Sequence, residues 1–190
     1  MMSALPSDFL LSCRDFREAA SEGSAALLRV GFGVTPENPR YPSLRESFFT
    51  AYEARCRKPT LFPGVTELLA AIDRKGLVWG IVTNKPQEFA EAIAASTPAM
   101  ARCAIVVGSR PGVPLKPAPD GILRALKELA LKPEQTLYTG DDRRDIEAGK
   151  AAGTSTLLAL WGYRPKDADT SLWAPDFTAS SPEDIIRLLP

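Results

Sequence analysis

From residue 65 onward, short apolar runs alternate with longer segments of helical periodicity, and this alternation constrains the fold more than any other feature of the chain. Parallel strands need long crossover connections, which helices usually supply. The pattern therefore predicts an α/β fold, a three-layer Rossmann-like parallel sheet with helices on both faces. We predict strands over 77–82, 104–107, 136–138, 154–160 and 177–179, and helices over 65–75, 88–95, 118–130, 142–152 and 182–189.

The segment before residue 59 has no strand signal and predicts a separate helical region. Helical spacing of apolar residues runs through 8–30, and three prolines within 35–42 predict a loop. Ser43 is expected to N-cap the next helix. We therefore predict two domains, a small helical one over 1–58 and an α/β core over 59–190.

The composition limits the available chemistry. The chain has no histidine, which excludes a Ser-His-Asp triad, a histidine base and histidine-ligated zinc. Lys plus Arg and Asp plus Glu number 23 each, so no basic field exists to hold nucleic acid or a membrane surface. Cys13, Cys56 and Cys103 are widely spaced, which predicts reduced thiols in a cytoplasmic protein. We expect neither nucleic acid nor a membrane as a partner.

A cluster of acids follows the short apolar run that begins at residue 137. Asp141, Asp142 and Asp145 come directly after Gly140, at the predicted carboxyl end of a strand. Ligands of open α/β sheets bind at that end of the strands. Crowded carboxylates repel one another unless a cation lies among them, and Mg²⁺ prefers such oxygen ligands. The alternative is a polar loop in which Asp141 or Asp142 N-caps the next helix.

Two other loops after predicted strands carry polar residues that suit an anion. Thr83 and Asn84 offer a hydroxyl and backbone N–H groups at a helix start, although either residue could simply cap that helix. Lys116 lies between prolines that restrict its backbone, and its charge suits a phosphate oxygen, although a solvated loop lysine would fit as well. We expect Thr83, Lys116 and Asp141 to converge on one pocket for a phosphate and Mg²⁺.

These segments together resemble the haloacid dehalogenase-like phosphatases. Within that family the sequence is most similar to the phosphoglycolate phosphatase group and the N-acetylmuramic acid 6-phosphate phosphatases, over roughly residues 20–190. The matching stretches are Gly-Leu-Val-Trp-Gly-Ile-Val-Thr-Asn-Lys-Pro at 76–86, Lys-Pro-Ala-Pro at 116–119, Gly-Asp-Asp-Arg-Arg-Asp-Ile-Glu-Ala-Gly at 140–149, and Trp-Gly-Tyr at 161–163.

The resemblance implies Mg²⁺-dependent hydrolysis of a small phosphorylated metabolite, with residues 1–58 as part of a helical cap. It places Thr83 and the Asn84 N–H at the transferring phosphoryl group, and Lys116 where it stabilises charge on that group. It makes Asp141 a Mg²⁺ ligand and Asp145 a support of the metal site.

The family's catalytic motif, Asp-x-Asp-Gly-Thr at the end of a first strand, does not occur in these 190 residues. In the family its first aspartate attacks phosphorus and its second acts as general acid and base. The aspartates before residue 60 are Asp8 and Asp15, and neither has a second aspartate two positions on. We therefore expect a truncated chain that binds Mg²⁺ weakly or not at all and is inactive or nearly so.

In the family the absent strand lies in the middle of the sheet, between the strands at 77–82 and 136–139. Three arrangements would compensate for it: direct pairing of the two flanking strands, a strand supplied in trans by a homodimer or other partner chain, or an N-terminal extension. The alternative function is a non-catalytic protein of this fold that binds a phosphorylated metabolite or a protein partner.

Overall fold

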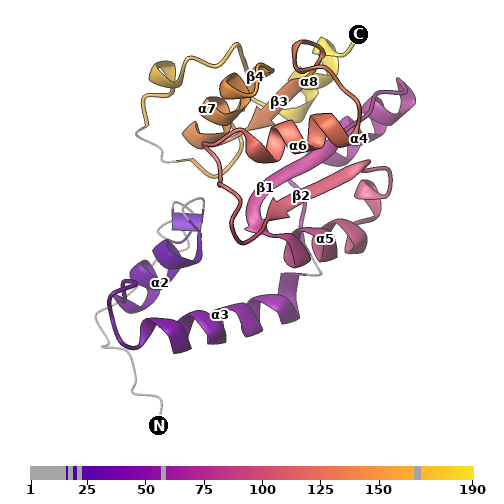
Figure 1. The fold of residues 1–190 in the computed structure, drawn as a ribbon. Helices are drawn as coiled ribbons and strands as arrows, with labels where there is room; N and C mark the ends of the chain where they lie inside the picture. The colour runs from indigo at the N-terminus through magenta and orange to yellow at the C-terminus, as the bar shows by residue number, and fades with distance from the viewer. Residues whose placement is uncertain (1–15, 17–18, 21–22, 57–58, 165–167) are drawn as a thin grey trace. The chain divides into compact units, whose positions relative to one another are not determined.

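The structure is a computed structural model, and it describes residues 16, 19–20, 23–56, 59–164 and 168–190 (Figure 1). The chain divides into two compact units, Met1–Tyr52 and Glu53–Pro190. This division lies inside helix α3, whereas the sequence predicted a boundary between residues 58 and 59. Within the described ranges, no helix combines the length and the apolar character that crossing a bilayer requires.

The first unit contains α2 (Ser24–Phe32) and the greater part of α3 (Tyr41–Cys56). Helix α2 ends at Gly33, which adopts the left-handed conformation with φ 63°. The prediction of Ser43 as an N-cap is wrong, because α3 already begins at Tyr41 and the Ser43 hydroxyl donates to the Arg40 carbonyl. A proline at the second helical position is tolerated, because N–H groups of the first turn have no acceptor within the helix. Of the helical stretch predicted over residues 8–30, residues 8–15, 17–18 and 21–22 lie outside the described residues.

The second unit contains the predicted parallel strands, which confirms the fold class. They form two sheets within the described residues: β1 (Gly80–Pro86) pairs with β2 (Ile105–Ser109), and β3 (Leu137–Gly140) pairs with β4 (Ser155–Ala159), which pairs with β5 (Phe177–Ala179). All these pairings are parallel. Direct pairing of the strands that flank the expected gap does not occur, since β1 and β3 belong to different sheets.

Helices cover the sheets and complete the three layers. The α-helices of this unit are α4 (Val65–Arg74), α5 (Gln87–Ser96), α6 (Asp120–Glu128), α7 (Arg143–Ala151) and α8 (Pro182–Leu188), and short 3₁₀ turns lie at Pro98–Met100, Pro133–Gln135 and Thr170–Trp173. One apolar cluster joins α4 and α8 to β4 and β5 through Leu68, Ile185, Leu157 and Ala179.

A second apolar cluster connects the two sheets. It consists of buried residues of α6 and α7 together with Ala152, and Val82 of β1 and Tyr138 of β3 both pack against it. Both sheets therefore rest on the same helical layer, and this layer positions the ends of β1 and β3 near each other.

Strand β1 begins later than the sequence predicted. Leu77 and Val78 lie outside it, with exposed fractions of 36% and 56%. The cause is the end of α4, where Gly76 has φ 67° and the N–H of Leu77 donates back to the Ile72 carbonyl. This C-terminal cap uses the N–H that a strand would need. The strand instead continues through Thr83 and Asn84 to Pro86, so both candidate residues lie in β1 and not in the loop after it.

Candidate functional site

The candidate residues gather at the carboxyl ends of β1 and β3. Thr83 and Asn84 lie in the second half of β1, and Asp141 directly follows β3. Lys116 lies in the loop before α6, and Asp145 is in the first turn of α7. These residues come from three separate segments of the chain, 83–84, 116 and 141–145. Ligands of parallel α/β sheets bind at the carboxyl ends of the strands.

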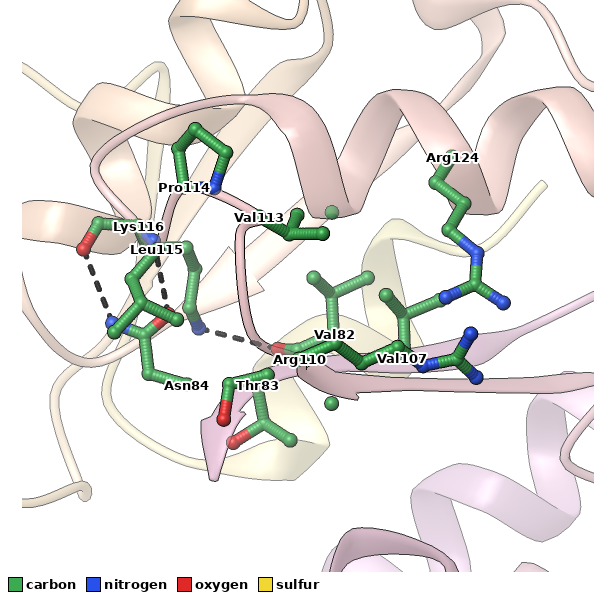
Figure 2. A pocket seen from close by; sticks show the side chains of 13 residues that line it. Val82, Thr83, Asn84, Val107, Arg110, Val113, Pro114, Leu115, Lys116 and Arg124 are labelled. Carbon is green, nitrogen blue, oxygen red and sulfur yellow. Dashed lines mark hydrogen bonds between the residues drawn. The ribbon is translucent and has the colours of Figure 1, made fainter. Parts of the chain in front are cut away.

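Asn84 attaches the lysine loop to β1 (Figure 2). Its side-chain Nδ2 donates to the Lys116 carbonyl at 3.1 Å, and its Oδ1 accepts the Lys116 N–H at 2.9 Å. The sequence predicted a role for the backbone N–H of Asn84. The structure shows in addition that its amide side chain fixes the backbone of Lys116, where the peptide bond to Pro117 is cis.

Thr83 lies beside this pair on β1, and its hydroxyl accepts the N–H of Lys85 at 3.2 Å. No hydrogen bond joins its side chain to Lys116 or to Asp141 among the residues described. Thr83, Asn84 and Lys116 line a cavity of about 50 Å³ together with Arg110 and residues of β2 (Figure 2). A cavity of this size holds a few water molecules but not a metabolite.

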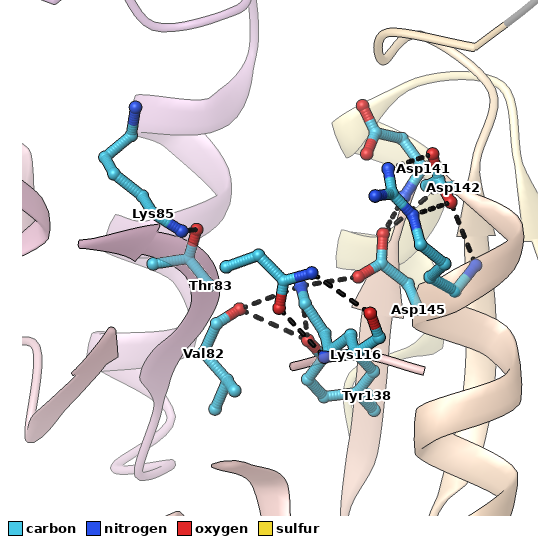
Figure 3. Close-up of polar contacts among 10 residues, drawn as sticks. Val82, Thr83, Lys85, Lys116, Tyr138, Asp141, Asp142 and Asp145 are labelled. Carbon is cyan, nitrogen blue, oxygen red and sulfur yellow. Dashed lines mark hydrogen bonds and ion pairs between the residues drawn. The ribbon is translucent and has the colours of Figure 1, made fainter. Parts of the chain in front are cut away.

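Lys116 is the centre of the site (Figure 3). Its ammonium donates to Asp145 Oδ1 at 2.6 Å, the Tyr138 hydroxyl at 3.1 Å and the Val82 carbonyl at 3.2 Å, which satisfies all its donors. The Lys116 and Asp145 side chains are only 14% and 8% exposed. Burial alone would lower the pKa of Lys116, but the facing oxygens of Tyr138 and Asp145 outweigh it and raise that pKa above the ordinary value. The amine is therefore held as a cation.

Tyr138 completes this network, although no role was predicted for it. Its hydroxyl also donates to the Val82 carbonyl at 3.2 Å, so β3 contacts β1 through a side chain. Burial is the main reason that the pKa of Tyr138 is raised, which keeps the phenol neutral and able to donate. The available signal in the sequence was a phenol at the end of the predicted strand over 136–138.

Asp142 and Asp145 organise the start of α7. Asp142 caps the helix, because its Oδ1 accepts the Arg144 N–H at 2.9 Å, and Asp145 Oδ2 accepts the N–H groups of Asp141 and Asp142 at 3.2 and 3.1 Å. The capping alternative drawn from the sequence is therefore confirmed for Asp142. Burial would raise the pKa of Asp142, but its bonds to Arg144 dominate and lower it.

Asp141 lies beside this helix start with a different environment. Burial is the largest cause that raises its pKa, and nearby Asp145 adds to the shift. Its Oδ2 accepts the N–H of Tyr163 at 2.5 Å, while Oδ1 has no hydrogen bond to another described residue. A side chain at Gly162 would clash with the Asp141 carboxylate, and one at Gly140 would clash with Asp145. The Trp-Gly-Tyr stretch at 161–163 was selected from the sequence by resemblance only. In the structure Gly162 leaves room for the Asp141 carboxylate, and the Tyr163 N–H donates to it.

Few carboxylate oxygens of Asp141, Asp142 and Asp145 are available to bind a metal ion. Within the described ranges, no three Asp, Glu, Cys or His side chains are grouped so that they could hold an ion. Both oxygens of Asp145 are bonded, and Asp142 pairs with Arg144 at 2.8 Å. Asp141 Oδ1 is the carboxylate oxygen best able to accept Mg²⁺, which would then take its other ligands from water and phosphate. The donor set thus fits a weak Mg²⁺ site, and metal binding stays a prediction.

Residues 28–159 match the family model of the haloacid dehalogenase-like hydrolases. The chain is 35% identical over 176 residues to an N-acetylmuramic acid 6-phosphate phosphatase of Pseudomonas aeruginosa, which covers 91% of this chain and 77% of that protein. It is 36% identical over 176 residues to a phosphoglycolate phosphatase of Xanthomonas campestris pv. campestris, with 92% and 79% covered.

Solved structures agree on the fold. A predicted phosphoglycolate phosphatase from Haemophilus somnus superposes with a TM-score of 0.81 at 21% identity, over 94% of this chain and 82% of that one. A haloacid dehalogenase-like family protein from Streptococcus pneumoniae gives a TM-score of 0.79 at 24% identity, over 97% and 83%.

Proposed function

This chain belongs to the haloacid dehalogenase-like hydrolase family, and we propose that its core binds the phosphoryl group of a small phosphomonoester together with Mg²⁺. The observation that supports this most is the buried Lys116 ammonium at the carboxyl ends of β1 and β3. An ammonium that is kept charged suits the oxygens of a phosphate. A phosphate oxygen would take the place of one of its present acceptors, such as the Val82 carbonyl.

Each candidate residue has a distinct part in this proposal. Lys116 faces a phosphoryl oxygen, and Thr83 together with the Asn84 N–H binds the remaining oxygens. Asp145 orients the ammonium through its 2.6 Å ion pair. Asp141 is the proposed Mg²⁺ ligand, and bound Mg²⁺ would neutralise charge on the phosphate.

The names of the relatives supply the candidate substrates. Phosphoglycolate and N-acetylmuramic acid 6-phosphate are both phosphomonoesters of small molecules, and we propose a metabolite of this class for the chain. A cytoplasmic location also remains a proposal, drawn from the wide spacing of the cysteines in the sequence.

We propose further that these 190 residues by themselves bind such a ligand with little or no turnover. Covalent phosphoryl transfer needs a nucleophile in line with phosphorus, and no Asp-x-Asp-Gly-Thr motif is present in the sequence. Asp142 and Asp145 are poor substitutes, because each is already bound to a cation and to backbone N–H groups. The second candidate function, a non-catalytic sensor of a phosphorylated metabolite, is favoured by the same observation.

Two measurements test the proposal. Isothermal titration with inorganic phosphate and with phosphoglycolate, each with and without Mg²⁺, should show binding that Lys116→Met abolishes. The surface variant Arg187→Met, which lies outside the lining of the cavity, should leave that binding unchanged. Absence of phosphate binding would refute the site itself. Hydrolysis of an aryl phosphate should stay near background, and robust turnover would refute the predicted inactivity.

A further inference from the structure

Basic side chains line the cavity beside Thr83 without an acidic residue among them. The cavity has a volume of about 50 Å³, and its described lining includes Arg110, Lys116 and Arg124 but no Asp or Glu. Figure 2 shows the guanidinium groups of Arg110 and Arg124 on the side of the cavity away from Lys116. A cavity whose charged side chains are all cationic favours an anionic ligand.

Arg110 differs from the other two cations in having no partner for its charge. The Lys116 ammonium is paired with Asp145 at 2.6 Å. Arg124 Nε is paired with Glu128 Oε1, also at 2.6 Å. The Arg110 guanidinium has no hydrogen bond or ion pair with any residue in the described part of the chain. An incoming anion can therefore bind Arg110 without displacing an existing carboxylate.

A tight turn holds Arg110 at the carboxyl end of β2. Residues 110–113 read Arg-Pro-Gly-Val, and the Arg110 carbonyl accepts the Val113 N–H at 3.2 Å. Gly112 has φ 77°, so proline and glycine occupy the two central positions that a type II turn favours for them. Strand β2 pairs with β1 up to its last residue, Ser109. The turn therefore places Arg110 beside the carboxyl end of β1.

The rest of the cavity suits a short hydrocarbon chain. Val82, Val107 and Val113 contribute apolar walls between the Lys116 side and the arginine side (Figure 2). A volume of about 50 Å³ has room for a group of a few heavy atoms, such as a carboxylate, but not for a sugar ring. A ligand that fits thus has its phosphoryl group at the Lys116 side and a small anionic group a short chain away.

We propose that Arg110 determines ligand specificity by binding a carboxylate of the phosphorylated ligand. The inference rests on the proposed phosphate site at Thr83, Asn84 and Lys116, and it narrows the ligand to the phosphomonoester of a short-chain hydroxy acid. The guanidinium offers a planar set of donors that matches the two oxygens of a carboxylate. Arg124, which is paired already, adds a second positive charge to the same cavity.

A carboxylate fits this place better than a second phosphoryl group. Arg110 contributes one charge without a partner, and the single charge of a carboxylate balances it. A phosphoryl group carries a charge of about −1.5 to −2 at pH 7 and is bulkier, so it would need a second unpaired cation. The described lining offers none on that side, because Arg124 is paired with Glu128.

Titration calorimetry with two esters of equal chain length tests the inference. Ethyl phosphate and phosphoglycolate share the phosphoryl group and the chain length, and only phosphoglycolate carries a carboxylate. The wild type should bind phosphoglycolate about tenfold more tightly, as expected for a hydrogen bond between charged groups. Arg110→Gln should reduce this preference to less than about twofold, mainly through weaker binding of phosphoglycolate.

A matched variant controls for the loss of positive charge. Arg187→Gln removes the same charge from a side chain of α8 that is 77% exposed and lies outside the lining of the cavity. It should keep the full preference for phosphoglycolate. Arg110→Lys, which keeps the charge but not the planar set of donors, should keep only part of it. Urea unfolding should give the same midpoint for Arg110→Gln and the wild type, since Arg110 is exposed.

Three results would overturn the inference while leaving the phosphate site intact. They are equal affinity of the wild type for the two esters, an equal loss of both esters in Arg110→Gln, and a preference that Arg187→Gln lowers as much as Arg110→Gln does. Binding of neither ester by the wild type would instead refute the proposed phosphate site, and the inference would fail with it.

Discussion

Replacement of Lys116 by methionine is expected to destabilise the core strongly. The substitution keeps most of the side-chain volume but removes the ammonium and its bonds to Asp145, Tyr138 and Val82. Asp145 is only 8% exposed, so its charge would remain buried with only backbone N–H groups as partners. Breaking a buried pair in this way costs about 3–5 kcal/mol, a large part of the roughly 5–15 kcal/mol that stabilises an ordinary domain.

Urea unfolding followed by circular dichroism measures this loss. With a slope of about 2 kcal/mol per molar urea, the midpoint of Lys116→Met should fall by about 1.5–2.5 M. Arg124→Met is the matched control, because the Arg124–Glu128 pair is 35% and 46% exposed and is worth only about 0.3–0.5 kcal/mol. The double variant Lys116→Met, Asp145→Asn should recover part of the loss, since it leaves no unpaired buried charge.

The pH dependence gives a second check on the same pair. The folded-state pKa of Lys116 is raised, so its contribution to stability is fully present below the unfolded-state pKa of about 10.4 and is lost as the pH rises through the folded value. The stability difference between the wild type and Lys116→Met should therefore stay constant from pH 7 to pH 9. A loss below 1 kcal/mol, or a double variant no more stable than the single one, would refute the description of this pair as buried and coupled.

Three other predictions concern separate parts of the core. Gly162→Ala should lower stability by about 1–3 kcal/mol in urea unfolding, because the added methyl group meets the Asp141 carboxylate; an unchanged midpoint would contradict that contact. Asp176→Ala should cost about 1–3 kcal/mol, since the buried Thr156 loses its acceptor for both N–H and hydroxyl at 2.7 Å. Those Thr156 bonds lower the pKa of Asp176, so this contribution is present above an unfolded-state pKa of about 3.9 and should be lost as the pH falls through the lower folded-state value. Asp141→Asn should abolish any Mg²⁺-dependent strengthening of phosphate binding in titration calorimetry, whereas the exposed Asp120→Asn should not; equal loss in both would refute Asp141 as the ligand.

The positions of the core strands were predictable because each buried strand is a short apolar run between helix and turn signals. The strand at Phe177–Ala179 agrees at both ends. The strand predicted over 77–82 began too early, at Leu77 and Val78. Their apolar character does not reveal that the C-terminal cap of α4 uses the Leu77 N–H. Ser43 misled the prediction in another way, since a serine in the first turn of a helix bonds a preceding carbonyl as readily as it caps.

The site was predicted as a set of residue types and not as a set of contacts. Lys116 and Asp145 were both selected, but one was assigned to the phosphate and the other to the metal. Their 2.6 Å pair joins residues 29 positions apart, and a sequence does not state where side chains at such a separation point. Tyr138 was missed because a tyrosine in a strand is usually a packing residue. Its hydroxyl reaches the Val82 carbonyl because β1 and β3 belong to different sheets and do not pair with each other.

The packing of both sheets on α6 and α7 has a consequence for the cooperativity of unfolding. Sheets that exchange backbone hydrogen bonds unfold together, whereas two sheets joined through side chains and helix packing can open as separate foldons. The strands β1 and β2 would then exchange their amides at a rate unlike that of β3 to β5. Any segment that bridged β1 and β3 would fuse the two foldons into one unit, so ligand-induced stiffening in this core would extend well beyond the residues that touch the ligand.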